Sequence, residues 1–129
     1  MPYYSYDSFT DAEFSDLVGE TLTNVIQKSD GGEDELVFET TSGKIFSMHH
    51  RQDCCENVSI EDIVGNLEDL VGSPILRASE DSNRGEREDY ESETWTFYNI
   101  ATHKGYVTIR WYGSSNGYYS EGVSFILLK

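Results

Sequence analysis

The chain has 129 residues, a hydrophobic content of 37% and a formal net charge of −15 at pH 7. This length and apolar content predict one globular domain that needs no stapling metal or disulfide framework to fold. The negative charge disfavours binding to nucleic acids and to anionic membranes, because both repel an acidic surface. Two interpretations of the charge remain: it keeps the protein soluble, or it imitates nucleic acid in the basic groove of a partner protein.

The first residues, Met1-Pro2-Tyr3-Tyr4, lack the basic start and the apolar run of a secretory signal. No segment approaches the roughly 20 apolar residues that a membrane-spanning helix requires. We therefore expect a cytoplasmic protein, which would be the host cytoplasm if a phage encodes it. Cys54 and Cys55 are the only cysteines. Because adjacent cysteines are poorly placed for a bond and the compartment is reducing, we expect two free thiols.

The N-terminal half reads as a short helix followed by three strands. Residues 1–9 form an irregular lead, and Thr10 is a candidate cap for a helix that Gly19 ends. Apolar alternation and turn residues then predict strands at 22–28, 36–41 and 45–50.

The C-terminal half reads as a helix, a long loop and a set of strands. Ser59 and Asp62 form a capping-box-like pattern that predicts a helix over 60–71. A strand starts at Ile75. The acidic segment 80–93 has no apolar period and predicts a long charged loop. Further strands are predicted at 94–102, 106–112 and 118–128, with a hairpin at Asn116-Gly117 between the last two.

These elements predict a single α+β domain over residues 1–129, with one antiparallel sheet of about six to seven strands and one or two short helices. The segment 14–19, Phe-Ser-Asp-Leu-Val-Gly, resembles the segment 67–72, Leu-Glu-Asp-Leu-Val-Gly, and predicted strands follow each. This favours a degenerate internal repeat, although such a helix ending also recurs by chance. If the repeat is real, its two unusual loops occupy equivalent positions and could face each other.

A cluster of reactive side chains follows the third predicted strand. His49, His50, Cys54 and Cys55 are all potential zinc ligands, but their spacing differs from that of known zinc sites. A nucleophilic cysteine needs a nearby base and an electropositive pocket, whereas acids flank this pair and raise the thiol pKa. We therefore expect no metal, no cofactor and no enzymatic activity.

Aromatic residues crowd the three C-terminal strands, and Arg110 lies among them between Ile109 and Trp111. An isolated arginine beside aromatic rings and Asn116 has the chemistry that a nucleotide-like anion requires. Its guanidinium binds phosphate in a bidentate manner, and a ring stacks on a base. The alternative interpretation of Arg110 is a cross-strand ion pair.

Four motifs carry a family resemblance over roughly residues 14–127. They are Gln52-Asp53-Cys54-Cys55-Glu56, the predicted helix ending at Leu70-Val71-Gly72, Trp95-Thr96-Phe97, and Asn116-Gly117-Tyr118-Tyr119. Together they resemble a small domain found in bacteria and their phages. More distantly, they are similar to a family of phage anti-defence sponges, which sequester the cyclic ADP-ribose signals of bacterial Thoeris immunity.

The resemblance implies a non-enzymatic phage counter-defence protein that sequesters a small cyclic nucleotide-like signal. It also implies a homo-oligomer, a dimer or larger, with ligand pockets between subunits. Phe97 matches the aromatic residue that stacks on the ligand, and the matching hairpin contains Asn116, Tyr118 and Tyr119. With Arg110 and Arg51 added, the expected ligand-binding residues number six. The alternative function is an acidic protein-interaction module or inhibitor that mimics nucleic acid.

Overall fold

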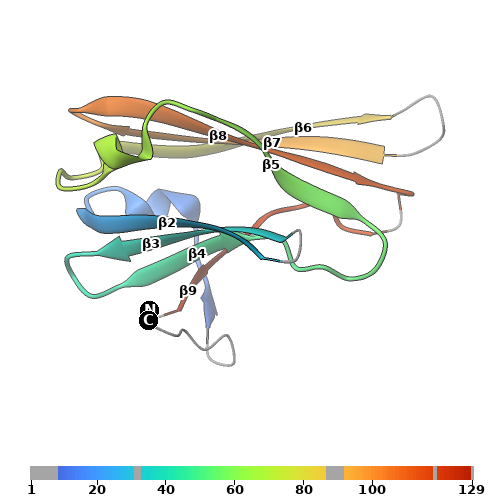
Figure 1. Cartoon of the computed structure of the whole chain (residues 1–129), viewed down its shortest axis with the longest axis horizontal. Coiled ribbons are helices and arrows are strands. Elements are labelled where there is room, and N and C mark those ends of the chain that lie inside the picture. The colour runs from blue at the N-terminus through green and yellow to red at the C-terminus, as the bar shows by residue number, and fades with distance from the viewer. Residues whose placement is uncertain (1–8, 31–32, 87–91, 118, 129) are drawn as a thin grey trace.

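Two antiparallel β-sheets stack face to face in the structure, a computed structural model that describes residues 9–30, 33–86, 92–117 and 119–128 (Figure 1). The elements in chain order are β1 (Thr10–Asp11), the 3-10 helix η1 (Phe14–Leu17), β2 (Leu22–Asp30), β3 (Glu33–Thr40), β4 (Ile45–His49), β5 (Asn57–Val64), the 3-10 helix η2 (Leu67–Leu70), β6 (Arg77–Glu86), β7 (Ser92–Thr102), β8 (Gly105–Ser115) and β9 (Ser124–Leu127). One sheet has the order β1-β9-β4-β3-β2, and the other has the order β5-β8-β7-β6.

The hydrophobic core lies between the two sheets. Alternate side chains of each strand point into this space, because successive residues of a strand face opposite sides. Trp111 of β8 reaches across it, and its indole Nε1–H donates to Met48 Sδ of β4 at 3.2 Å. Phe125 of β9 stacks on Phe46 with ring centroids 5.3 Å apart. Strands β3, β7 and β8 supply six more core residues: Leu36, Phe38, Tyr98, Ile100, Val107 and Ile109.

The same structural unit occurs twice in the chain, which supports the predicted internal repeat. The order η1-β2-β3-β4-β5 in the first half corresponds to η2-β6-β7-β8-β9 in the second half. The last strand of each unit crosses to the opposite sheet, so that β5 pairs with β8 and β9 pairs with β4. Neither sheet is therefore complete without a strand from the other unit.

Reciprocal hydrogen bonds join the two units near their 3-10 helices. The amide of Gly19 donates to the carbonyl of Ile75 at 2.9 Å, and the amide of Gly72 donates to the carbonyl of Leu22 at 2.9 Å. Both glycines have positive φ values, 89° and 88°, at the point where each 3-10 helix has ended. A residue with a side chain adopts that conformation only with strain. The repeated Val-Gly pair thus marks the same structural junction twice.

The predicted α+β class is too rich in helix. The described residues form nine strands and two four-residue 3-10 helices, so the fold is β-rich. Most of the expected helix over 60–71 is instead the strand β5 and the short η2. A register shift between Ile60 and Asp62 explains the error. It places the apolar residues Val58, Ile60 and Ile63 at spacings of two and then three, and the second spacing imitates a helical period.

Two other predictions in the C-terminal half are wrong. The expected charged loop over 80–93 is largely strand: β6 continues to Glu86 and β7 begins at Ser92, while residues 87–91 lie outside the described ranges. β6 lies at a sheet edge and contributes only Ala78 to the core, so it needs no apolar alternation. The expected hairpin at Asn116-Gly117 does not form, because the chain leaves β8 and crosses to the other sheet as β9. In the described ranges, no helix has the length and apolar character needed to cross a lipid bilayer.

Equivalent leucines in the two 3-10 helices should contribute similarly to stability. Leu17 and Leu70 are both fully buried. We expect Leu17→Ala and Leu70→Ala each to lower the free energy of unfolding by about 3 kcal/mol, because each leaves a cavity in the core. Leu76, whose side chain is 63% exposed, supplies the control. Leu76→Ala should change stability by less than about 0.5 kcal/mol. Urea unfolding measures all three, and an unequal response of the two buried sites would contradict their equivalence.

Candidate functional site

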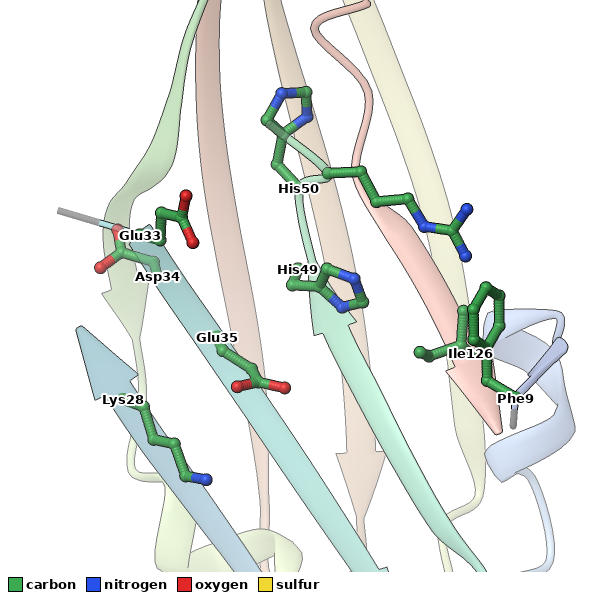
Figure 2. A pocket seen from close by; sticks show the side chains of 9 residues that line it. Phe9, Lys28, Glu33, Asp34, Glu35, His49, His50 and Ile126 are labelled. Carbon is green, nitrogen blue, oxygen red and sulfur yellow. The ribbon is translucent and has the colours of Figure 1, made fainter. Parts of the chain in front are cut away.

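A pocket of about 420 Å³ lies on the outer face of the five-stranded sheet, away from the core (Figure 2). Its walls come from four strands and from the segments that precede β1 and follow β4. The lining residues are Phe9, Lys28, Glu33, Asp34, Glu35, His49, His50, Arg51 and Ile126. The volume is within the range of small-molecule sites, roughly 300–1,000 Å³.

A row of polar side chains crosses the floor of the pocket. Lys28 of β2 is in register with Glu35 of β3, and Glu35 is in register with His49 of β4. Figure 2 shows these three side chains next to one another on adjacent strands. They share the outer face because their neighbours in sequence, such as Leu36 and Met48, point into the core. Sheet pairing therefore assembles a cation, a carboxylate and an imidazole.

A buried hydroxyl determines the protonation of His49. The Ser47 hydroxyl donates to Glu35 Oε2 at 2.6 Å and lies 3.1 Å from His49 Nδ1. Since that hydroxyl has only one proton, His49 Nδ1–H must be the donor in the second contact. Burial lowers the pKa of His49, although the charge of Glu35 opposes this effect. Burial thus favours the neutral form of His49.

A cation and an aromatic ring form the opposite wall. The Arg51 guanidinium carbon lies 4.3 Å from the centroid of the Phe9 ring, a cation–π contact. Figure 2 shows Phe9 beside Ile126 of β9. Among the acidic lining residues, Asp34 has a structural role, because its carboxylate accepts from the Ser29 hydroxyl at 2.6 Å and from the Ile60 amide at 2.7 Å. The wall formed by Arg51, Phe9 and Ile126 thus combines positive charge with apolar surface.

His50 lines the pocket but is held by the loops on its other side. Its Nδ1 lies 2.7 Å from the carbonyl oxygen of Gly122, and its Nε2 lies 3.0 Å from Glu56 Oε2. Gly122 belongs to the loop of the second repeat unit. The two unusual loops therefore contact each other, as expected if the repeat is real.

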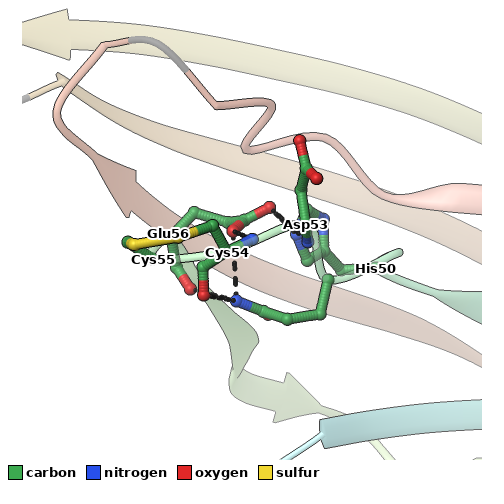
Figure 3. The surroundings of a disulfide bond; sticks show 6 residues. His50, Asp53, Cys54, Cys55 and Glu56 are labelled. Carbon is green, nitrogen blue, oxygen red and sulfur yellow. Dashed lines mark hydrogen bonds and ion pairs between the residues drawn. A yellow bond between two sulfur atoms is a disulfide. The ribbon is translucent and has the colours of Figure 1, made fainter.

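The Glu56 carboxylate organises the turn that contains the cysteines (Figure 3). It accepts from the amides of Asp53 and Cys54, at 3.0 and 2.8 Å, and from the Gln52 side chain at 3.1 Å. Burial raises the pKa of Glu56, but hydrogen bonds from the backbone and from His50 outweigh it and bring the pKa down to about 2. The Gln-Asp-Cys-Cys-Glu motif is therefore a turn built around a buried anion.

Cys54 and Cys55 form a disulfide with each other, so the prediction of two free thiols is wrong. The turn around Glu56 brings both side chains to one side, whereas a strand would have directed them to opposite faces. Figure 3 shows the bond on the side of the turn away from His50. Among the described residues, no group of three or more histidine, cysteine, aspartate or glutamate side chains is arranged to hold a metal ion.

The five expected ligand-binding residues that the structure describes lie in three separate places. Phe97 and Arg110 are in register with each other on the outer face of the four-stranded sheet. Arg110 Nε lies 2.7 Å from Glu61 Oε1, an ion pair that matches the alternative interpretation of this residue. Asn116 and Tyr119 belong to the loop after β8, with Asn116 roughly 20 Å along the chain from Arg110. Tyr118 lies outside the described residues. Of the five described ones, Arg51 alone is among the residues that line the pocket.

Sequence reasoning missed the second of two equivalent buried carboxylates. Glu121 accepts from the hydroxyls of Thr94, at 2.7 Å, of Ser92, at 3.3 Å, and of Ser115. It occupies the position in the second loop that Glu56 occupies in the first. The signal was visible in the chain: Glu-Asn-Val-Ser at 56–59 recurs as Glu-Gly-Val-Ser at 121–124. Lys28 and Ile126 had no such signal, because only strand pairing brings them beside His49.

The low pKa of Glu56 predicts a specific sensitivity to acid. Its folded-state pKa of about 2 is below the ordinary value of 4.5, so the ionised carboxylate stabilises the fold above pH 4.5. This stabilisation should disappear as the pH falls towards 2. Glu56→Gln should lower stability at pH 7 and flatten the acid dependence between pH 4.5 and 2. The exposed Glu68 provides the matched control, Glu68→Gln. Urea unfolding across this pH range checks both, and an unchanged acid profile in Glu56→Gln would refute the role of Glu56.

The family described as a domain of unknown function, DUF7448, matches residues 11–125. Because the match covers most of the chain, the protein belongs to this family. No curated protein and no solved structure matches the chain.

Proposed function

We propose that this member of the DUF7448 family binds and sequesters a small nucleotide-like signal in the pocket on the five-stranded sheet. The observation that carries the proposal is the concentration of cationic and imidazole groups there. The chain has nine lysines and arginines and three histidines against 24 acids, yet Lys28, Arg51, His49 and His50 all line one pocket. The carboxylates of Glu33, Asp34 and Glu35 line the same pocket, so we place the anionic group of the ligand against Lys28 and Arg51.

The pocket chemistry supports a nucleotide-like ligand in particular. Lys28 and Arg51 supply charge for phosphate groups. Phe9 and Ile126 supply apolar surface for a base. The Glu33 carboxylate, on an exposed residue of the pocket rim, can accept from sugar hydroxyls or amino groups.

Binding without chemical change is part of the proposal. Ser47, the hydroxyl that contacts His49, is fully buried and already donates to Glu35, so it is poorly placed to attack a ligand. Together with the resemblance to anti-Thoeris sponges, this supports a phage-type counter-defence protein that acts in the host cytoplasm. Its ligand would be a cyclic ADP-ribose type of signal, and the functional state would be a homo-oligomer.

Calorimetric titration with cyclic ADP-ribose isomers and cyclic oligonucleotides tests the proposal. We expect binding of one of these ligands, and mass spectrometry of the released ligand should show it intact. Lys28→Ala and Arg51→Ala should each weaken binding by roughly 10- to 100-fold, because each removes a charge-assisted contact. Arg77→Ala, at an exposed position on β6, is the charge-matched control and should bind normally. No heat and no retained ligand at high protein concentration would refute the proposal.

Variants on the other sheet distinguish two placements of the site. If the ligand occupies the pocket described here, Phe97→Ala and Arg110→Ala should leave the affinity unchanged. Loss of binding in these two variants, with normal binding in Arg51→Ala, would place the ligand on the four-stranded sheet instead. Thermal unfolding of each variant separates lost binding from lost structure.

A second candidate function is an acidic module that mimics nucleic acid for a basic protein partner. Exposed acids on two strands of the four-stranded sheet favour it: Glu61, Asp62, Glu80 and Asp81. Such an association should weaken steeply with salt. A pull-down at low and at high salt tests it, since a small ligand enclosed in a pocket should be retained better at high salt.

A further inference from the structure

β6 is an edge strand, and most of its length faces solvent. It pairs with β7 on one side and, among the strands that the structure describes, with none on the other. Its ten residues make it longer than most strands in globular proteins. The four residues from Asp81 to Arg84 are all exposed. Figure 1 shows β6 running alongside β7 at one end of the sandwich. An edge of this kind has unpaired amide and carbonyl groups that another strand can use.

We propose that two copies of this chain pair through β6, antiparallel, with Ser82 of one copy opposite Ser82 of the other. The pairing would join the two four-stranded sheets into one continuous sheet of eight strands. The partner is a second copy of the chain, and the interface is isologous, so each contact occurs twice. This interface does not depend on the ligand, because the pocket lies on the other sheet.

Strand geometry limits the possible registers. In an antiparallel pair, directly opposed residues point to the same face of the sheet. A two-fold axis between identical strands must therefore place one residue opposite its own counterpart. A centre at Glu80 or at Asp81 would place an acid against the same acid. A centre at Asn83 would place Arg84 opposite Ser82, which has no charge to pair with the guanidinium.

The register centred on Ser82 is complementary in charge. It places Arg84 opposite Glu80 and, by symmetry, Glu80 opposite Arg84. It also places Asn83 opposite Asp81, where an amide can donate to a carboxylate. Arg84 makes no ion pair within the part of the chain that the structure describes. A register centred on Ser79 would instead oppose Arg77 and Asp81, so variants of Arg77 and Arg84 distinguish the two registers.

The expected oligomer can be measured directly. Sedimentation equilibrium of the full chain should show a dimer in equilibrium with monomer. Arg84→Glu places acid opposite acid twice and should weaken the dimer by at least about tenfold. Arg77→Glu makes the same change of charge on the same strand, outside the proposed charge pairs, and should dimerise like the original chain.

Exchanging the charges of Glu80 and Arg84 gives the decisive experiment. The double variant Glu80→Arg/Arg84→Glu restores opposite charges in the same register and should recover dimerisation. Tyr98 donates to Glu80 at 3.2 Å, so thermal unfolding must confirm that each variant is folded. Three outcomes would overturn the proposal: a monomeric original chain at high concentration, equal effects of Arg84→Glu and Arg77→Glu, or a folded double variant that stays monomeric.

Discussion

The exchange of strands between the two repeat units is the constraint on which the rest of the structure depends. Without β9, the edge of β4 would be open, and without β5, the edge of β8 would be open. Each sheet thus contains strands from both halves of the chain. The pocket follows from this exchange, because its floor combines Lys28 and His49 of the first unit with Ile126 of the second.

Two buried carboxylates make the crossing possible. The chain must leave one sheet, turn and enter the other, and its backbone amides and hydroxyls lose their sheet partners as it turns. Glu56 accepts from the amides of the first turn, and Glu121 ties the second turn to hydroxyls of β7 and β8. A buried charge is tolerated in such a place only when hydrogen bonds surround it. The link between His50 and Gly122 then joins the two turns and fixes the backbone next to Arg51.

Local sequence signals predicted the regular strands and failed where distant contacts decide the structure. β2, β3, β4, β7 and β8 were visible because their alternation and turn residues act over a few positions. β5 was read as helix because its register shift disturbs the alternation. The Asn116-Gly117 dipeptide favours a hairpin locally, but Phe125 is buried beside Phe46 of the other sheet, and that packing outweighs the turn preference. Of the residues that line the pocket, the sequence identified only Arg51 as ligand-binding. The others come together only when four strands pair.

Strand exchange also affects how the chain is made. After β4 has emerged from the ribosome, about 75 residues must follow before β9 arrives, which at typical rates takes roughly 4 to 15 seconds. During that interval the nascent chain has an open strand edge beside Phe46 and Met48, which is a template for aggregation. Pairings between such distant segments also fold slowly. The feature that closes the finished sandwich therefore makes translation the period in which this protein most needs a chaperone.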